Sequence, residues 1–113
     1  MVNQGQRIEA SRFKRAPRFN RQIPLRYRIP GEPRWHVGTT ENISLSGVLF
    51  RGLHPLQSNS PIQLSFVVHS KLSAKAIGVI ICDGHVVRTE PPSRGASAMG
   101  FAAKISDRHF LPA

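Results

Sequence analysis

The chain has 113 residues, which is the size of one small domain with a single hydrophobic core. Hydrophobic residues make up 40% of it and charged residues 19%, which excludes a wholly disordered chain because such chains are poor in apolar residues. The formal net charge of +10 predicts an anionic partner, namely a nucleic acid, an acidic membrane surface or a phosphate-bearing ligand.

Cysteine content and hydropathy bear on the compartment. Cys82 is the only cysteine, so the chain forms no internal disulfide, as expected in a reducing compartment. No apolar run approaches the ~20 residues that cross a bilayer, and the first residues lack the apolar stretch of a signal peptide. We therefore expect a cytoplasmic protein without membrane insertion.

Residues 1–21 differ from the rest of the chain. They mix Gln, Asn, Gly, Ser and Arg, with no sustained period of apolar residues. Positive charge is concentrated at this end, since residues 1–28 hold eight basic side chains and one acidic side chain. The pattern predicts a flexible basic N-terminal arm over residues 1–21 and a folded domain over residues 22–113. The simplest alternative for the arm is a basic tail that aids solubility or touches nucleic acid non-specifically.

The domain over residues 22–113 is predicted to be all-β. β-branched and aromatic residues come in short runs separated by turn residues, and no helical period is strong. In the run over residues 61–69, Ile62, Leu64 and Phe66 alternate with mostly polar residues, as in a half-buried strand. About six strands result, over residues 23–29, 34–43, 46–51, 61–69, 75–90 and 98–105.

The number of short strands favours a small antiparallel barrel or sandwich, because closure removes exposed strand edges. In the third strand, Val48 and Phe50 are expected on one face, with Leu49 and Arg51 on the other. After the last strand, Ser106-Asp107 could cap a helix of at most one turn.

Two segments carry a more specific pattern. The first is Lys14-Arg15-Ala16-Pro17-Arg18, just before the first strand, and the second is Asn42-Ile43-Ser44-Leu45-Ser46-Gly47. In order and spacing they resemble the PilZ domain family, whose signature is R-x-x-x-R, a strand, and then D/N-x-S-x-x-G. The segment Gly84-His85-Val86-Val87-Arg88 and the closing strand through Gly100-Phe101 also resemble that family.

The resemblance implies a six-stranded antiparallel β-barrel that serves as a non-catalytic receptor for cyclic di-GMP, acting alone or on a downstream protein partner. It also bears on Asp83-Gly84, which local turn rules predict to be a two-residue hairpin. Because the resemblance implies one continuing strand here, a β-bulge at this glycine is favoured.

The arm supplies the first half of the predicted site. Cyclic di-GMP has two phosphodiester charges and two guanines whose N7 and O6 atoms accept hydrogen bonds. Arginine suits both, because its planar guanidinium pairs with guanine or phosphate in a bidentate way and stacks on a base. Arg15 and Arg18 are predicted for these roles, and Lys14 for a phosphate contact. Lys14 stands where the family has its first arginine and lacks the planar group, so Arg15 or Arg12 could take the stacking role.

The second segment supplies the other half. By resemblance, Asn42 hydrogen-bonds a guanine edge, Ser44 a phosphate or a guanine, and Gly47 lets the backbone approach the ligand. The alternative is a purely structural turn, in which the Asn and Ser side chains hydrogen-bond their own backbone. The predicted ligand-binding residues are Lys14, Arg15, Arg18, Asn42, Ser44 and Gly47.

Other functions have less support. No nucleophile with an adjacent base and no pair of carboxylates is evident, and the five histidines lack metal-ligand spacing, so neither an enzyme, a metal site nor a cofactor is predicted. A small basic β-barrel that binds RNA or DNA explains the charge but not the N-x-S-x-x-G segment, and Trp35 is expected to pack rather than stack on bases. A PilZ-like domain that has lost its ligand and acts through protein contacts is the third alternative, and Lys14 favours it.

Overall fold

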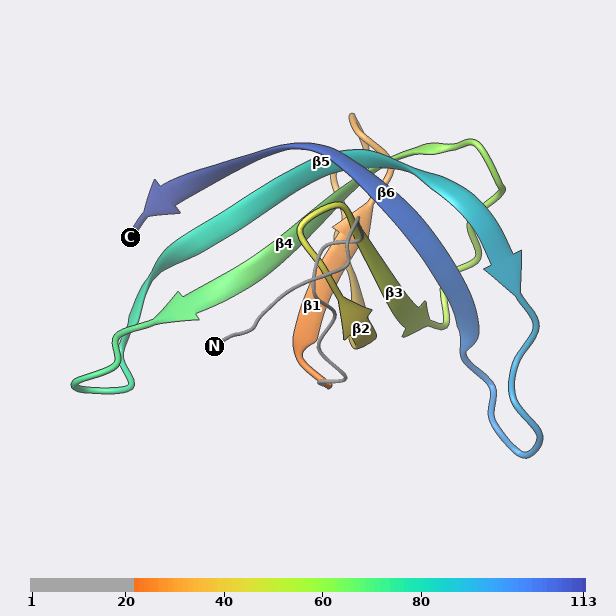
Figure 1. Cartoon of the computed structure of the whole chain (residues 1–113), viewed down its shortest axis with the longest axis horizontal. Coiled ribbons are helices and arrows are strands. Elements are labelled where there is room, and N and C mark those ends of the chain that lie inside the picture. The colour runs from red at the N-terminus through yellow and green to blue at the C-terminus, as the bar shows by residue number, and fades with distance from the viewer. Residues whose placement is uncertain (1–21) are drawn as a thin grey trace, which may run out of the picture.

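Residues 22–113 are described by the computed structural model of the protein, and they form six β-strands (Figure 1). The predicted all-β fold is confirmed, and this part of the chain contains no helix that could span a bilayer. The predicted arm over residues 1–21 lies outside the described residues. The strands are β1 (Pro24–Arg28), β2 (His36–Ile43), β3 (Gly47–Gly52), β4 (Pro61–His69), β5 (Ala76–Glu90) and β6 (Met99–Pro112).

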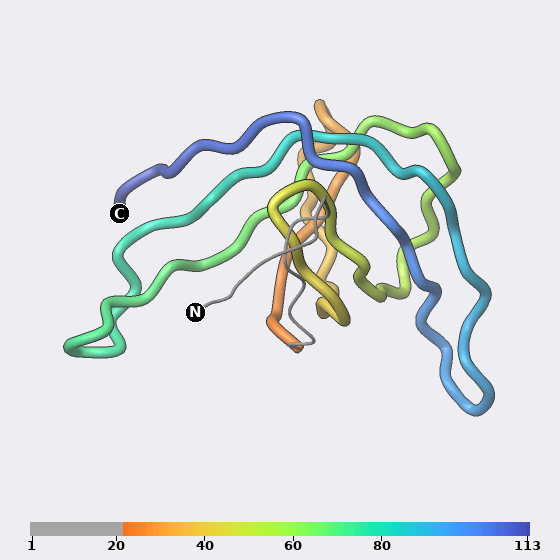
Figure 2. The backbone as a smooth tube through the Cα atoms, in the orientation of Figure 1, coloured from red at the N-terminus to blue at the C-terminus, as the bar shows by residue number. Residues whose placement is uncertain are grey.

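The six strands close into an antiparallel barrel in the order β1-β2-β3-β6-β5-β4 (Figure 2). β1 completes the ring, because it pairs with β2 on one side and with β4 on the other. The predicted six-stranded antiparallel barrel is therefore confirmed.

Three aromatic side chains fill the interior of the barrel. Tyr27 of β1, Phe50 of β3 and Phe101 of β6 are fully buried, and their ring centroids lie 5.1 to 6.1 Å apart. Their tilted arrangement is one that aromatic pairs favour. Val48 faces the same core as Phe50, and the residues that alternate with them are only partly buried, so the predicted alternation along the third strand is confirmed.

β5 runs through Asp83-Gly84 without a turn. Its pairing register with β6 shifts between these two residues, which is the mark of a β-bulge. A Cβ on Gly84 would collide with the backbone carbonyl of Lys104, so glycine is needed for this close approach of the strands. The bulge is confirmed, and the hairpin that local turn rules favour does not form.

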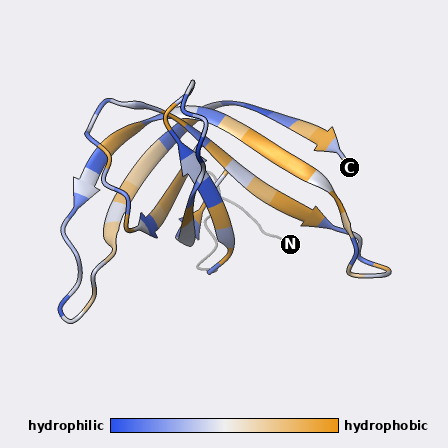
Figure 3. Ribbon diagram, turned by 180° about the vertical axis from the view of Figure 1, so that it is seen from behind, coloured by the Kyte–Doolittle hydropathy of each residue, from blue (hydrophilic) through white to orange (hydrophobic). Residues whose placement is uncertain are grey.

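β6 continues to Pro112 rather than ending near residue 105. Ser106-Asp107 lies within the strand and begins no helical turn, because the residues after Ile105 keep pairing with β5. The end of β4, the start of β5 and the end of β6 thus form an extension beyond the rest of the barrel (Figure 1). Its hydrophobic stretches are visible in Figure 3, and four of these side chains are exposed: Val67, Ile77, Phe110 and Leu111.

The Tyr27 hydroxyl ties the core to the segment after β3. It donates a hydrogen bond to the His54 carbonyl at 2.7 Å and accepts one from the His54 amide at 2.9 Å. Gly52 makes room for the tyrosine, because a Cβ at this position would collide with the ring and its hydroxyl. Burial raises the pKa of Tyr27 above its ordinary value of 10.0. The backbone of His54 is therefore held by a side chain of the core.

Candidate functional site

The N-x-S-x-x-G segment forms the bend between β2 and β3, which end and begin at Ile43 and Gly47. The Ser44 amide donates to the Gly47 carbonyl at 2.9 Å, and the Gly47 amide donates to Ser44 Oγ at 3.1 Å. The Ser44 hydroxyl therefore holds the bend in shape, as the structural alternative predicts. Within residues 22–113 the structure shows no such bond for the side chain of Asn42, whose amide keeps its donors and acceptor.

Gly47 lies at a close approach of β3 to β6. It pairs with Lys104, and a Cβ at this position would lie 3.0 Å from the Ala103 carbonyl oxygen. That distance is tighter than ordinary van der Waals contact, so a Cβ here would require β3 or β6 to shift by a few tenths of an ångström. Glycine at this position thus has a structural role whether or not a ligand binds.

A hollow of about 160 Å³ lies beside the bend. Asn42, Ser44 and Gly47 all line it, so the structure brings together the three predicted residues of the second segment. Ala102 and Ala103 of β6 contribute small apolar surfaces. The hollow combines polar groups with an apolar surface, a combination that suits part of a small ligand.

Arg88 of β5 also lines the hollow and was missed among the predicted binding residues. The β5–β6 register shifts between Val86 and Arg88, and the Arg88 side chain is 62% exposed, with an ion pair of 3.2 Å to Glu90. The signal available in the sequence was its place at the end of the family-like Gly84–Arg88 segment, in an otherwise apolar run. Arg88 brings a guanidinium to a site that the bend alone leaves without charge.

A second arginine contacts the bend from β6. Arg108 donates a hydrogen bond to the carbonyl of Leu45 and lines an apolar cavity of about 230 Å³ on the other side of the bend. Cys82 lies in the same cavity, and burial raises the pKa of its thiol above the ordinary 9.0, only partly offset by the charge of Arg108. The thiol is thus kept protonated near neutral pH, and the sequence-based interpretation of Cys82 as a buried small side chain is confirmed.

Comparison with known protein families establishes the family of the chain. The family model of the PilZ domain matches residues 11–109, which is most of the chain. The chain belongs to the PilZ domain family. This is a family of cyclic di-GMP receptors, and its domains are in general binding domains rather than enzymes. Searches of curated proteins and of solved structures find no match.

The PilZ match spans both predicted halves of the site, but the structure describes only the second. Lys14, Arg15 and Arg18 lie outside the described residues. The place where the chain enters the barrel is described, and it lies beside β2: the Ile23 amide donates to Thr40 Oγ1 at 2.8 Å, and the Thr40 amide donates to the Ile23 carbonyl at 2.9 Å. The chain thus joins the barrel two residues from Asn42 along β2.

Trp35 was the aromatic side chain considered for base stacking. It is partly buried, and the guanidinium of Arg28 lies over its ring at 4.1 Å from the centroid. This cation–π contact covers one face of the indole. The packing role expected for Trp35 therefore agrees with the structure.

Proposed function

We propose that this PilZ domain is a cyclic di-GMP receptor that holds its ligand between residues 14–18 and the bend over residues 42–47, with Arg88 as a third contact. The observation that carries the proposal is the entry of the chain beside the bend, through the paired hydrogen bonds of Ile23 and Thr40. Binding would order the arm against the barrel, and the ordered arm would be the signal for a downstream protein partner in the cytoplasm.

Chain length permits this arrangement. Arg18 precedes Ile23 by five residues, which can span at most about 17 Å. Asn42 follows Thr40 by two residues, or about 7 Å of strand. Because β1 is antiparallel to β2, the N-terminal end of β1 lies beside the end of β2 that carries Asn42. An arginine at position 18 is therefore within reach of a ligand on the bend.

The size of the hollow favours a second covering element. Pockets for small ligands usually have volumes of roughly 300 to 1,000 Å³, whereas the hollow beside the bend has about 160 Å³. A dinucleotide seated there would keep most of its surface outside the barrel. A basic arm with guanidinium groups would cover that surface, neutralise the phosphates and stack on the bases.

The proposed roles follow from the chemistry of each group. Arg15 and Arg18 would pair with guanine N7 and O6 or with phosphate, and Lys14 would contact a phosphate. Asn42 would hydrogen-bond a guanine edge, with both a donor and an acceptor to offer and without the negative charge of an aspartate. Ser44 would fix the bend and contact a phosphate or a guanine, and Gly47 would let the backbone approach the ligand. Because the Ser44 hydroxyl donates to the Gly47 carbonyl at 3.3 Å, it would have to turn in order to donate to the ligand instead.

The first test is titration calorimetry of the whole chain with cyclic di-GMP. Arg18→Ala should weaken binding at least tenfold, or about 1.4 kcal/mol, because the arm must recover its ordering entropy through such contacts. Lys71→Ala is the matched control, since it removes an equal charge from the exposed segment between β4 and β5. Equal affinity of wild type and Arg18→Ala would refute the clamp.

Titration with single- and double-stranded oligonucleotides at two salt concentrations separates the other functions. Binding through many phosphates should collapse as salt rises, whereas a two-phosphate ligand held partly by stacking should lose much less affinity. Tighter binding of oligonucleotides than of cyclic di-GMP would overturn the receptor proposal. Binding of neither would leave a domain that acts through protein contacts.

A further inference from the structure

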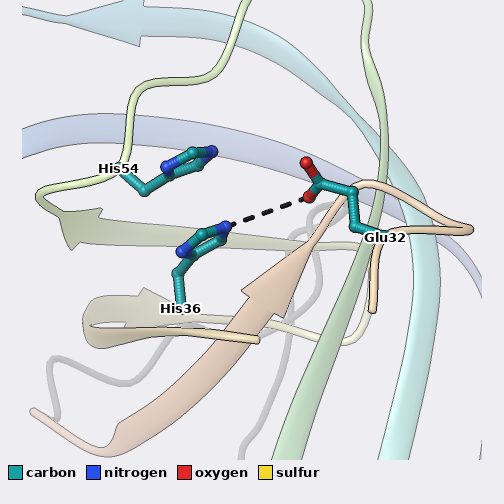
Figure 4. Close-up of side chains that lie close together, drawn as sticks. All are labelled: Glu32, His36 and His54. Atoms are coloured by element: carbon teal, nitrogen blue, oxygen red, sulfur yellow. Dashed lines mark ion pairs between the residues drawn. The ribbon is translucent and has the colours of Figure 1, made fainter. Parts of the chain in front are cut away.

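A cluster of two histidines and a glutamate lies at the end of β2 opposite the bend. Glu32 belongs to the turn between β1 and β2, His36 begins β2, and His54 follows β3 (Figure 4). One side-chain ligand atom from each of the three lies within 4.8 Å of the other two. We infer that Glu32, His36 and His54 form a binding site for a first-row divalent cation, with Zn²⁺ the best match.

The backbone of the turn holds Glu32 in place. Its carboxylate Oε1 accepts a hydrogen bond from the Ile29 amide at 3.0 Å, and its own amide donates to the Ile29 carbonyl at 3.0 Å. Arg28 donates to the Glu32 carbonyl at 2.9 Å. Hydrogen bonds of this kind orient metal-binding carboxylates and are a common feature of built sites.

The two histidines are held by the core. Tyr27 pairs with His36 in the β1–β2 register and bonds both backbone groups of His54 through its hydroxyl. The imidazole rings are stacked, with centroids 3.5 Å apart and planes 6° from parallel. His36 Nε2 lies 3.9 Å from Glu32 Oε1, and Figure 4 shows the carboxylate beside the nitrogen-bearing edges of the rings.

Coordination requires a contraction of the cluster and a rotation of the imidazole rings. Zn²⁺ lies about 2.0 to 2.1 Å from its nitrogen and oxygen ligands, so tetrahedral ligand atoms are about 3.3 Å apart. The lone pair of an imidazole lies in the ring plane, so the stacked rings of His36 and His54 must turn towards the ion. The side chains of His36 and Glu32 are 19% and 37% exposed, which gives the ion access while limiting solvent.

The donor set decides the class of cation. Two imidazole nitrogens with one carboxylate oxygen suit Zn²⁺, Co²⁺ and Ni²⁺, whereas Mg²⁺ and Ca²⁺ prefer oxygen ligands. A three-residue set leaves a fourth position for water or for another group. The remaining part of the chain, residues 1–21, contains no histidine or cysteine and one acidic residue, Glu9.

A second group of similar residues has different geometry. His109 Nε2 lies 3.1 Å from Asp83 Oδ2, and His109 Nδ1 lies 3.8 Å from Asp107 Oδ2. One ligand atom from each of these three residues also lies within 4.8 Å of the other two, but the two carboxylates approach different nitrogens of one ring. Asp107 and His109 are also exposed, at 66% and 49%. This arrangement is a surface ion-pair group, and it provides a control.

The test is titration calorimetry with ZnCl₂, with thermal unfolding in parallel. Wild type should bind one Zn²⁺ per chain and unfold at a higher temperature in its presence, because the ion binds the folded state. His54→Ala and Glu32→Gln should each weaken Zn²⁺ binding more than about tenfold. Glu32→Gln retains an oxygen for the Ile29 amide, so it removes the carboxylate with little change to the turn.

Controls make the outcome decisive. His109→Ala and the isolated, exposed His69→Ala should bind Zn²⁺ as wild type does, and MgCl₂ should have no effect on any variant. Unchanged Zn²⁺ affinity in both His54→Ala and Glu32→Gln, or its loss in His109→Ala alone, would overturn the inference. Cyclic di-GMP affinity should be unchanged in Glu32→Gln. The zinc proposal can therefore be refuted without refuting the nucleotide proposal, and the reverse also holds.

Discussion

The two proposed sites lie at opposite ends of β2 and differ in kind. At one end, Asn42 opens onto a shallow hollow that residues 22–113 leave incomplete for a dinucleotide. At the other, His36 meets Glu32 and His54, whose positions are fixed by a turn and by buried Tyr27. An incomplete site suits a receptor, because binding can order a separate segment and so produce a signal. A site built on the core suits an ion that stabilises the fold.

Gly52→Ala should have the largest effect on stability, and it acts at the His36 end of β2, where Tyr27 holds His54. The added Cβ would collide with the ring of Tyr27, which is fully buried and bonded to His54, so it cannot move aside without loss. We expect the free energy of unfolding, measured by urea denaturation, to fall by about 3 kcal/mol.

Gly31→Ala is the matched control for this collision. A Cβ at Gly31 has no atom within 4 Å, but the backbone φ of +94° disfavours an alanine, so a loss of about 1 kcal/mol is expected. A loss in Gly52→Ala no larger than the loss in Gly31→Ala would show that Tyr27 moves aside for the added Cβ at little cost.

Tyr27→Phe should lower the affinity for Zn²⁺ at one end of β2 without changing the affinity for cyclic di-GMP at the other. Removing the hydroxyl leaves the amide and carbonyl of His54 without their partner and should lower the free energy of unfolding by about 1 to 2 kcal/mol. Zn²⁺ affinity should fall about threefold because His54 is less firmly held. Cyclic di-GMP affinity should not change, because Asn42 lies about 20 Å from His36 along β2. Equal loss of both affinities in calorimetry would contradict two independent sites.

Much of the barrel could be predicted from the sequence, because its strands carry local patterns. The alternation of Ile62 and Leu64 gave β4 its correct bounds, and both residues are buried. The bulge at Gly84 required the family resemblance, since turn rules favour a hairpin there. The predicted end of β6 at residue 105 was wrong. Residues 106–112 continue the strand because they pair with the long strand β5, and their own sequence has no local pattern that reveals this pairing.

The same holds for the site residues: those contiguous in sequence could be predicted, and those brought together from separate strands could not. Asn42, Ser44 and Gly47 are contiguous in sequence, so their motif could be found and the structure brings them together. Arg88 was missed because it reaches the hollow from another strand. The cluster of histidines was missed for a similar reason: His36 and His54 come together only through strand pairing around Tyr27, and their separation in sequence resembles no metal-binding motif.

Arg88→Ala should reduce the affinity for cyclic di-GMP at the hollow beside Asn42, by a smaller factor than Arg18→Ala. Its side chain is largely exposed and already paired with Glu90, so the net gain from a ligand phosphate is modest. We expect cyclic di-GMP to bind about threefold more weakly by calorimetry, less than 1.4 kcal/mol, with Zn²⁺ affinity unchanged. Arg94→Ala, in the exposed loop before β6, removes the same charge and should bind as wild type does. Equal affinity in Arg88→Ala would exclude it from the site.

The smallest effect is expected at alkaline pH and concerns two buried side chains of the core, Tyr27 and Cys82. Burial raises the pKa of Tyr27 above 10.0 and that of Cys82 above 9.0, so the folded state keeps each proton at a pH where the unfolded chain releases it. Their contribution to stability is complete below those ordinary values and is lost as pH rises through the raised ones. In urea denaturation at a series of pH values, Tyr27→Phe should lose stability less steeply than wild type above about pH 10. Cys82→Ala should do the same from about pH 9. Identical slopes in wild type and Tyr27→Phe would mean that the hydroxyl is solvated in the folded state and does not anchor His54.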